Sequence, residues 1–123
     1  MSFDLKKLIR SFGFASKGII AAIISGQNMR IQLLAAIAVI AAGVYFHISV
    51  SEWCLVTLCI GMVWMAEAFN TAIEILTNHI QPQFHPEAGK VKDVAAGAVL
   101  IISIAAAIVG VLVFWKYLFQ LLK

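Results

Sequence analysis

Two long runs without a charged side chain limit what this chain can fold into more than any other feature. Residues 33–50 and residues 94–114 contain no Asp, Glu, Lys or Arg. About 20 apolar residues in a helix cross a bilayer core. Apolar residues make up 63% of the chain and charged residues 12%, against about 45–50% and about 25% in soluble domains. We therefore expect an all-α integral membrane protein, with 33–50 and 94–114 as transmembrane helices.

A third transmembrane helix is predicted between these two runs, at residues 53–76. No Pro or Gly interrupts residues 62–81, so the helix should be continuous there. Ser49 and Glu52 have the spacing of a capping box, which predicts a short turn before this helix. Residues 81–92 hold both prolines and a glycine, a composition typical of a loop. At 123 residues, the whole chain (1–123) is expected to be one domain.

The N-terminal segment, residues 2–25, has a different pattern. Apolar residues recur there at helical spacing, and Lys6, Lys7 and Arg10 lie to one side. A basic amphipathic helix of this kind is typical of one that lies in the membrane interface. The alternative is an ordinary helix that packs against its own protein. Gly26 is expected to end it.

The basic residues predict the orientation of the three spans. The N-terminal segment and the 81–92 loop would share one side, and that side would carry seven basic residues against two on the other. The positive-inside rule places the basic side in the cytoplasm. We expect a multi-pass protein of the bacterial cytoplasmic (inner) membrane, with a cytoplasmic N-terminus and active site. The net charge of +3 is too small and too dispersed to indicate a nucleic-acid partner.

The middle span carries a stripe of polar residues. At about 100° per residue, the stripe occupies one arc of about 100° on the helix. It consists of Glu67, Asn70, Thr71, Glu74 and Asn78. Polar amides in a membrane helix can simply join helices. Two carboxylates on the same face are costly in a membrane and indicate a functional site.

The start of the last span should complete this site. Antiparallel packing would bring Lys92 and Asp93 close to Glu74 and Asn78, at the cytoplasmic edge of the bilayer. Carboxylates can hold Mg²⁺, and a lysine can bind phosphate oxygens. A partly desolvated carboxylate can take a proton from a hydroxyl. Phosphoryl transfer needs these parts, because its catalysis is mainly positioning and charge stabilisation.

Two segments resemble the signatures of the prokaryotic diacylglycerol kinase family, which includes undecaprenol kinases. Residues 67–74 resemble its motif E-x-x-N-[ST]-A-I-E, and residues 84–93 resemble its second block, F-H-x-x-x-G-x-x-K-D. The resemblance implies a homotrimeric lipid kinase of the inner membrane. Its members phosphorylate a lipid alcohol, diacylglycerol or undecaprenol, with ATP and Mg²⁺.

The resemblance also implies roles for individual residues. Glu67 matches the family's catalytic base, and Asn70 lies with it in the active site. Glu74 matches a carboxylate that binds the metal and the nucleotide. Further contacts with the nucleotide are implied for Phe14, Lys17, Phe84, His85, Lys92 and Asp93.

One departure from the family pattern concerns the metal. Gly26 stands where the family usually has a second metal-binding glutamate, four residues before Arg30. Glu74 could suffice, since Mg²⁺ keeps several water and phosphate ligands; Asp93, Gln27 or another subunit could compensate. The alternative is a catalytically weakened or non-catalytic family member. A small proton-coupled membrane transporter is a further alternative, although such proteins usually have four spans and carry the carboxylate in the first.

Overall fold

Four helices account for nearly all of the chain. The computed structural model describes residues 2–123, and its helices are α1 (Leu5–Ser25), α2 (Gln27–Phe46), α3 (Val50–Ile80) and α4 (Pro86–Leu121). Each is long enough and apolar enough to cross a membrane, by length and composition. The predicted all-α fold with membrane-spanning character is confirmed.

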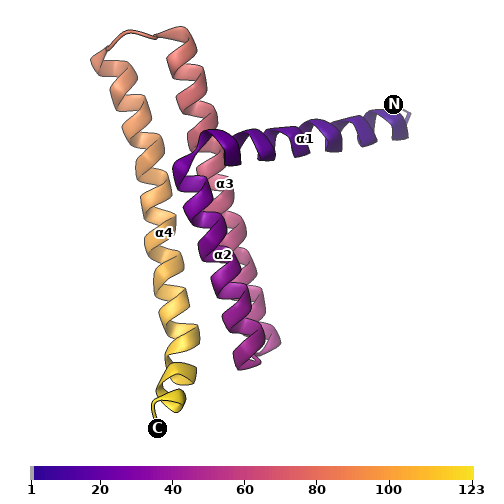
Figure 1. Ribbon diagram of the computed structural model, residues 1–123. Helices are drawn as coiled ribbons and strands as arrows, with labels where there is room; N and C mark the ends of the chain where they lie inside the picture. Colours follow the sequence, from indigo (N-terminus) through magenta and orange to yellow (C-terminus); the bar gives the residue numbers. More distant parts are fainter. Residues whose placement is uncertain (1) are drawn as a thin grey trace.

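Helices α2, α3 and α4 form a bundle, and α1 projects sideways from it (Figure 1). The most extensive packing joins α3 to α4, which run antiparallel. Helix α2 lies along α3, and α1 touches the bundle only near its own C-terminal end, where Ala22 is buried. The arrangement leaves most of α1 without a neighbour in the chain.

The break between α1 and α2 falls at Gly26, as the sequence predicted. The Gly26 N–H donates a hydrogen bond to the Ala22 carbonyl (3.0 Å), which closes α1, and the same residue precedes α2. Arg30 reaches back across the break and donates to the Ile24 carbonyl (3.3 Å). At its other end, α1 is capped by Asp4, whose carboxylate accepts from the Lys7 N–H (3.2 Å). Residues 2–4 therefore lie outside the helix predicted for 2–25.

The turn between α2 and α3 is short because two local structures meet there. Helix α2 ends at Phe46, since His47 takes a left-handed conformation (φ 53°, ψ 52°). The predicted capping box is confirmed: the Ser49 hydroxyl accepts from the Glu52 N–H and the Glu52 carboxylate accepts from the Ser49 N–H. Helix α2 thus ends four residues before the predicted span 33–50 does. No charged residue separates it from α3, so hydropathy alone could not mark the end.

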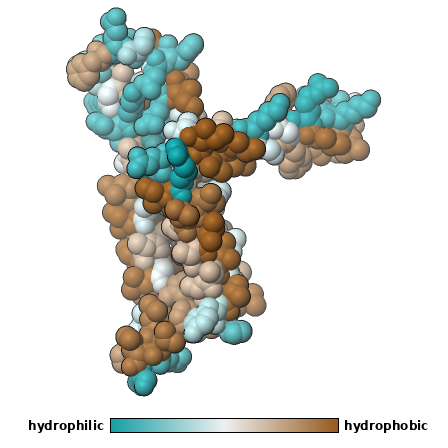
Figure 2. Space-filling view, viewed as in Figure 1, coloured by the Kyte–Doolittle hydropathy of each residue, from teal (hydrophilic) through white to brown (hydrophobic). Residues whose placement is uncertain are grey.

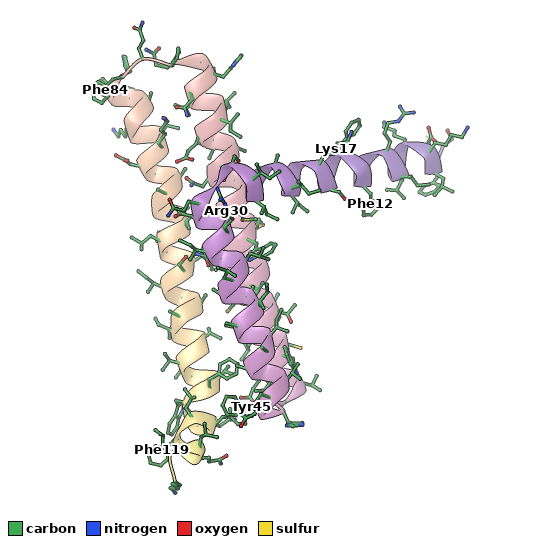
Figure 3. All side chains as sticks on the ribbon, viewed as in Figure 1. Phe12, Lys17, Arg30, Tyr45, Phe84 and Phe119 are labelled. Carbon is green, nitrogen blue, oxygen red and sulfur yellow. The ribbon has the colours of Figure 1, made fainter. Side chains whose placement is uncertain are left out.

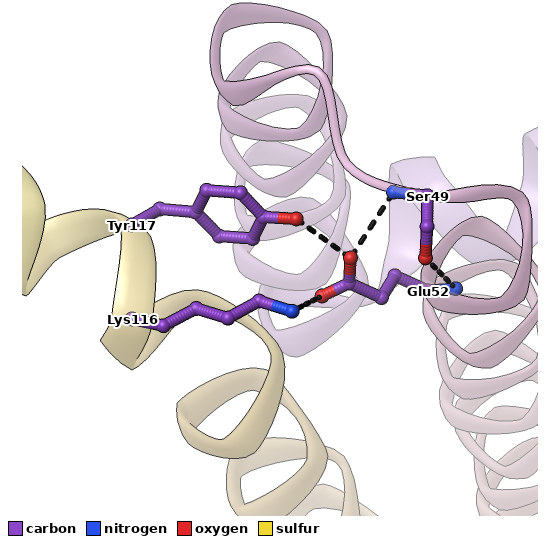
Figure 4. A network of polar contacts seen from close by, with 4 residues as sticks. All are labelled: Ser49, Glu52, Lys116 and Tyr117. Carbon is purple, nitrogen blue, oxygen red and sulfur yellow. Dashed lines mark hydrogen bonds and ion pairs between the residues drawn. The ribbon is translucent and has the colours of Figure 1, made fainter.

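Glu52 also ties the start of α3 to the end of α4 (Figure 4). The Tyr117 hydroxyl donates to Glu52 Oε1 (2.6 Å), and Lys116 Nζ lies 3.2 Å from Glu52 Oε2. An apolar cluster centred on Ile48, Val56 and Val113 packs beside this network. The two helices are therefore held together at the end of the bundle opposite the α3–α4 turn. The loop predicted for 81–92 is shorter than expected, because α4 begins at Pro86 with His85 as its cap.

The outer surface of the bundle is largely apolar (Figure 2). Large apolar side chains are exposed on every helix, including Leu34, Phe69 and Ile101. A polar region covers the end of the bundle that carries the α3–α4 turn. Water would be a poor solvent for such a surface, so acyl chains or further subunits must cover it.

Candidate active site

The middle of α3 buries a polar group of residues. Glu67, Asn70 and Thr71 are 2%, 6% and 7% exposed, and they are the buried polar or charged residues among the described ones. All three belong to the predicted stripe. They lie near the junction of α1 and α2, since a Cβ atom at Gly26 would be 3.6 Å from the Thr71 hydroxyl oxygen. These three residues of the stripe are therefore buried between the helices of a single chain.

Two atoms of this group lack hydrogen-bond partners. Within residues 2–123, neither Glu67 Oε2 nor Asn70 Oδ1 has one, although both atoms are buried. A buried polar atom without a partner costs about 1–3 kcal/mol. Proteins seldom carry this cost, and unpaired groups call for an explanation such as a catalytic role or a bound molecule.

The other end of the stripe is open to solvent. Glu74 and Asn78 are exposed, and Lys92 Nζ donates a hydrogen bond to Asn78 Oδ1. The prediction that antiparallel packing brings the start of α4 to Asn78 is confirmed. Asp93 follows Lys92 and is also exposed. The polar residues thus extend from the buried carboxylate of Glu67 to a cluster near solvent that contains acidic and basic side chains.

Several residues that sequence reasoning assigned to the nucleotide lie elsewhere in this single chain. Lys17 lies on the projecting part of α1 (Figure 3), and its Nζ is 6.0 Å from the ring centroid of Phe14. Phe84 is 92% exposed at the α3–α4 turn (Figure 3). The His85 ring accepts from the Glu87 N–H (3.2 Å) and caps α4. None of these four is packed against Glu67.

The carboxylates of the stripe suit a metal ion that is bound together with the phosphates of a substrate. The described residues contain no group of three or more His, Cys, Asp or Glu side chains that could hold a metal ion. Mg²⁺ is commonly bound through one or two carboxylates together with substrate phosphates and water. Glu74 offers such a carboxylate, and Gly26 offers none.

Two polar residues near the site were missed by the sequence analysis. Trp64 Nε1 and Ser103 Oγ are buried and have no hydrogen-bond partner in the described part of the chain. Both line a groove of about 270 Å³ between α2, α3 and α4. Trp64 precedes Glu67 by three residues and so lies on a neighbouring part of the same helix face. The only signal in the sequence was the three-residue spacing from Trp64 to Glu67.

Comparison with known proteins decides the family. The model of the family "Prokaryotic diacylglycerol kinase" matches residues 13–114, which is most of the chain. The chain belongs to this family. Membership makes it an enzyme of the lipid-kinase class, and the match spans the whole polar stripe and the α3–α4 turn.

Three relatives illustrate the similarity. An undecaprenol kinase of Bacillus subtilis is 35% identical over 111 residues, which cover 90% of each chain. A diacylglycerol kinase of Synechocystis sp. is 36% identical over 104 residues, which cover 84% of this chain and 59% of that one. A diacylglycerol kinase of Escherichia coli K12 is 26% identical over 111 residues, 90% of this chain and 91% of the relative. The relatives thus act on two different lipid alcohols.

The unpaired carboxylate at Glu67 generates a prediction about stability. We expect Glu67→Leu to raise the midpoint of thermal unfolding in detergent, because leucine removes a buried carboxylate whose Oε2 has no partner and keeps a similar volume. The matched control is Glu52→Leu. The Glu52 carboxylate is bound by Ser49, Lys116 and Tyr117, so its loss should lower the midpoint. If both variants lower the midpoint equally, Glu67 stabilises the fold as Glu52 does, and its burial is no evidence of a functional role.

Proposed function

We propose that this protein transfers the γ-phosphoryl group of ATP to the hydroxyl of a membrane lipid alcohol. The observation that carries the proposal is the buried, unpaired carboxylate of Glu67, which stands in the family's signature segment on one face with Glu74. Glu74 is exposed, and Glu67 is buried seven residues earlier on the same helix. In this proposal ATP approaches from water while a lipid approaches from the membrane.

Glu67 is proposed as the general base. It would accept the proton of the lipid hydroxyl while the hydroxyl oxygen attacks the γ-phosphorus and the bond to the β-phosphate oxygen breaks. The Glu67 Oε2 atom has no hydrogen-bond partner in the described residues, so it is available to accept this proton. Asn70 lies one turn along the helix, and its unpaired amide oxygen could accept from the same hydroxyl or hold a water molecule.

Glu74 is proposed to hold Mg²⁺ together with phosphate oxygens, and the bound ion would neutralise phosphate charge. Lys92 is proposed to bind phosphate and Asp93 to bind the nucleotide. In the absence of nucleotide, Lys92 donates to Asn78. A neutral amide holds an ammonium group more weakly than a phosphate does, so Lys92 could exchange one for the other. These assignments are supported by the exposed positions of Glu74 and Asp93 and by the half-buried Lys92, which contacts Asn78 of the stripe.

Phe14, Lys17, Phe84 and His85 are proposed to contact the nucleotide from another subunit of a homotrimer. One chain leaves them exposed and apart from Glu67, so they could reach a nucleotide at another copy's site. The apolar faces of the bundle support assembly, because they need a cover. Small residues along α4, such as Ala98, Ala105 and Ala106, permit close helix contact between subunits.

We propose that α1 lies in the interface of the cytoplasmic (inner) membrane while the other helices span it. Helix α1 projects sideways from the bundle, and its polar face points the same way as the polar α3–α4 turn (Figures 1 and 2). Its apolar face points along the bundle, where acyl chains would lie. The basic residues of α1 and of the first turns of α4 would then face the cytoplasm.

Phosphoryl transfer can be tested directly with purified protein in lipid nanodiscs. Labelled ATP with diacylglycerol or undecaprenol should give labelled lipid phosphate. Glu67→Gln should reduce turnover at least ~100-fold, because the amide cannot accept the proton, while the protein still assembles. The matched control is Glu52→Gln at the far end of the bundle, which should retain turnover. Absence of lipid phosphate from the wild type with either acceptor would reject the function, and an active Glu67→Gln variant would remove Glu67 from its role.

Gly26 gives a prediction about the metal. The backbone there (φ −109°, ψ 117°) suits any residue, but a Cβ would lie 3.0 Å from the Ala22 carbonyl oxygen, so any side chain requires a small local shift. The same Cβ would lie 3.6 Å from the Thr71 hydroxyl oxygen, beside the stripe. We expect Gly26→Glu to lower the Mg²⁺ concentration for half-maximal turnover about tenfold, which corresponds to about 1.4 kcal/mol. Gly26→Gln has the same size without the charge and should leave that concentration unchanged. If both variants act alike, position 26 does not supply a metal ligand. If both are inactive with an inactive wild type, the non-catalytic alternative holds.

The placement of α1 can be tested by spin labels. Single cysteines at positions 6–20, in a Cys54→Ala, Cys59→Ala background, would carry nitroxides in nanodiscs. For an interfacial helix, accessibility to a water-soluble nickel complex should rise and fall with a period of about 3.6 residues, out of phase with accessibility to oxygen. A fourth transmembrane helix would instead show low nickel accessibility throughout its centre.

A further inference from the structure

A groove lies between α2, α3 and α4 in the apolar part of the bundle, and one of its lining residues, Trp64, precedes Glu67 by three residues. Its volume is about 270 Å³, and its walls are almost entirely apolar, with Val56, Ile60 and Ala107 among them. Gln32, Trp64 and Ser103 supply polar groups to this lining, and two of these atoms, Trp64 Nε1 and Ser103 Oγ, have no partner in the described residues. Nothing in the account of phosphoryl transfer uses either residue.

The state of Ser103 is unusual for a serine in a helix. Such serines commonly donate to the carbonyl four residues earlier. Ser11, Ser16 and Ser25 all do so in this chain, at 2.9, 2.9 and 2.7 Å. The Ser103 hydroxyl is buried and makes no such bond within residues 2–123. Its hydrogen-bonding capacity is therefore unused, and because neighbouring atoms cover the oxygen, a group in the groove would reach it through a local shift of those side chains.

Both donors lie near the level of Glu67. Trp64 is three residues before Glu67, which is about 4.5 Å along the helix axis. The contacts of Asn78 with Lys92 and of Glu52 with Tyr117 fix the antiparallel register of α3 and α4. In that register Ser103 lies opposite Glu67, to within about one residue. Two hydrogen-bond donors thus stand less than one turn from the proposed base.

We propose that Trp64 and Ser103 form a carbonyl-binding subsite that selects an ester-linked lipid as the acceptor. The inference rests on the proposed kinase function. With the acceptor hydroxyl at Glu67, a neighbouring ester carbonyl would accept from Trp64 Nε1 and Ser103 Oγ, and one acyl chain would lie in the groove. In a glycerolipid the free hydroxyl and the nearest ester carbonyl are separated by a few bonds, a span comparable to the rise from Glu67 to Trp64.

A polyprenol would suit this subsite poorly. Apart from its hydroxyl, such a lipid carries no hydrogen-bond acceptor, so it would cover both donors and leave them unpaired. A site built to hydrogen-bond a substrate discriminates strongly against an analogue that lacks the group, because its own buried polar atoms lose their partners. The structure therefore points to an ester lipid such as diacylglycerol, although the polyprenol remains the competing acceptor in the test.

The kinetic test compares three acceptors: dioleoylglycerol, its diether analogue without carbonyls, and undecaprenol. Wild-type protein should use the ester with the lowest KM. Ser103→Ala and Trp64→Phe should each raise KM for the ester about tenfold, as expected for one lost hydrogen bond of about 1.4 kcal/mol. KM for the diether and kcat for all acceptors should change little. Ser11→Ala, which removes a hydroxyl that is bonded to its own helix, is the matched control and should change neither constant.

Two results would overturn the subsite. One is an equal effect of Ser103→Ala on the ester and the diether, which would mean that the hydroxyl acts on packing alone. The other is preferred use of undecaprenol by the wild type. Failure of the proposed function is distinguishable from both, because the wild type would then phosphorylate none of the three acceptors.

Occupancy of the groove can be measured without turnover. In a Trp53→Phe, Trp115→Phe variant, Trp64 is the only tryptophan. Diacylglycerol with brominated acyl chains should quench its fluorescence saturably, and well beyond the same bromine content in phosphatidylcholine. Ser103→Ala should weaken this saturable quenching. Equal quenching by both lipids would show that the groove takes any chain. No quenching by either would show that another copy of the protein fills it; both results contradict the proposal.

Discussion

The antiparallel pairing of α3 and α4 is the constraint on which the rest of the structure depends. Glu52 fastens the two helices at one end through Tyr117 and Lys116, and Asn78 fastens them at the other through Lys92. Because the two helices are joined at both ends, these contacts define a single register of α3 against α4. That register sets Ser103 opposite Glu67 and brings the basic start of α4 to the exposed end of the polar stripe. A slip of one turn would separate these groups by about 5.4 Å.

Between these paired helices, several buried polar atoms have no hydrogen-bond partner, which lowers the stability of the fold. Glu67 Oε2, Asn70 Oδ1, Trp64 Nε1 and Ser103 Oγ are buried without partners among the described residues, and all four lie within about two turns of the bundle. Elsewhere the polar groups are well satisfied: Ser49 and Glu52 cap each other, and three serines of α1 bond to their own helix. Unpaired atoms gathered at one level, in a family of lipid kinases, are consistent with a site built around a lipid hydroxyl and its neighbours. Under the proposed function, the cost of these unpaired atoms is a stability cost of the site.

Local patterns in the sequence predicted much of this arrangement. The 3.6-residue period put Glu67, Asn70 and Thr71 on one face, and the capping box at Ser49 fixed the start of α3. Other features depend on contacts that a pattern does not contain. The end of α2 at His47 follows from a left-handed residue in an uncharged run, and the exposure of Phe84 follows from how a turn is placed. Trp64 and Ser103 gain meaning only when two helices meet, since a tryptophan or a serine in an apolar run is ordinary by itself.

The central claim is that the acidic face of α3 forms the phosphoryl-transfer site, at the end of the bundle where the α3–α4 turn lies. A crystal structure grown from a lipid phase with Mg²⁺, a non-hydrolysable ATP analogue and a lipid alcohol tests it most directly. The account predicts phosphate density beside Glu74 and Lys92, with the lipid hydroxyl within hydrogen-bond distance of Glu67. Nucleotide bound at the Glu52–Lys116 end, or Glu67 turned toward acyl chains and away from both substrates, would contradict it.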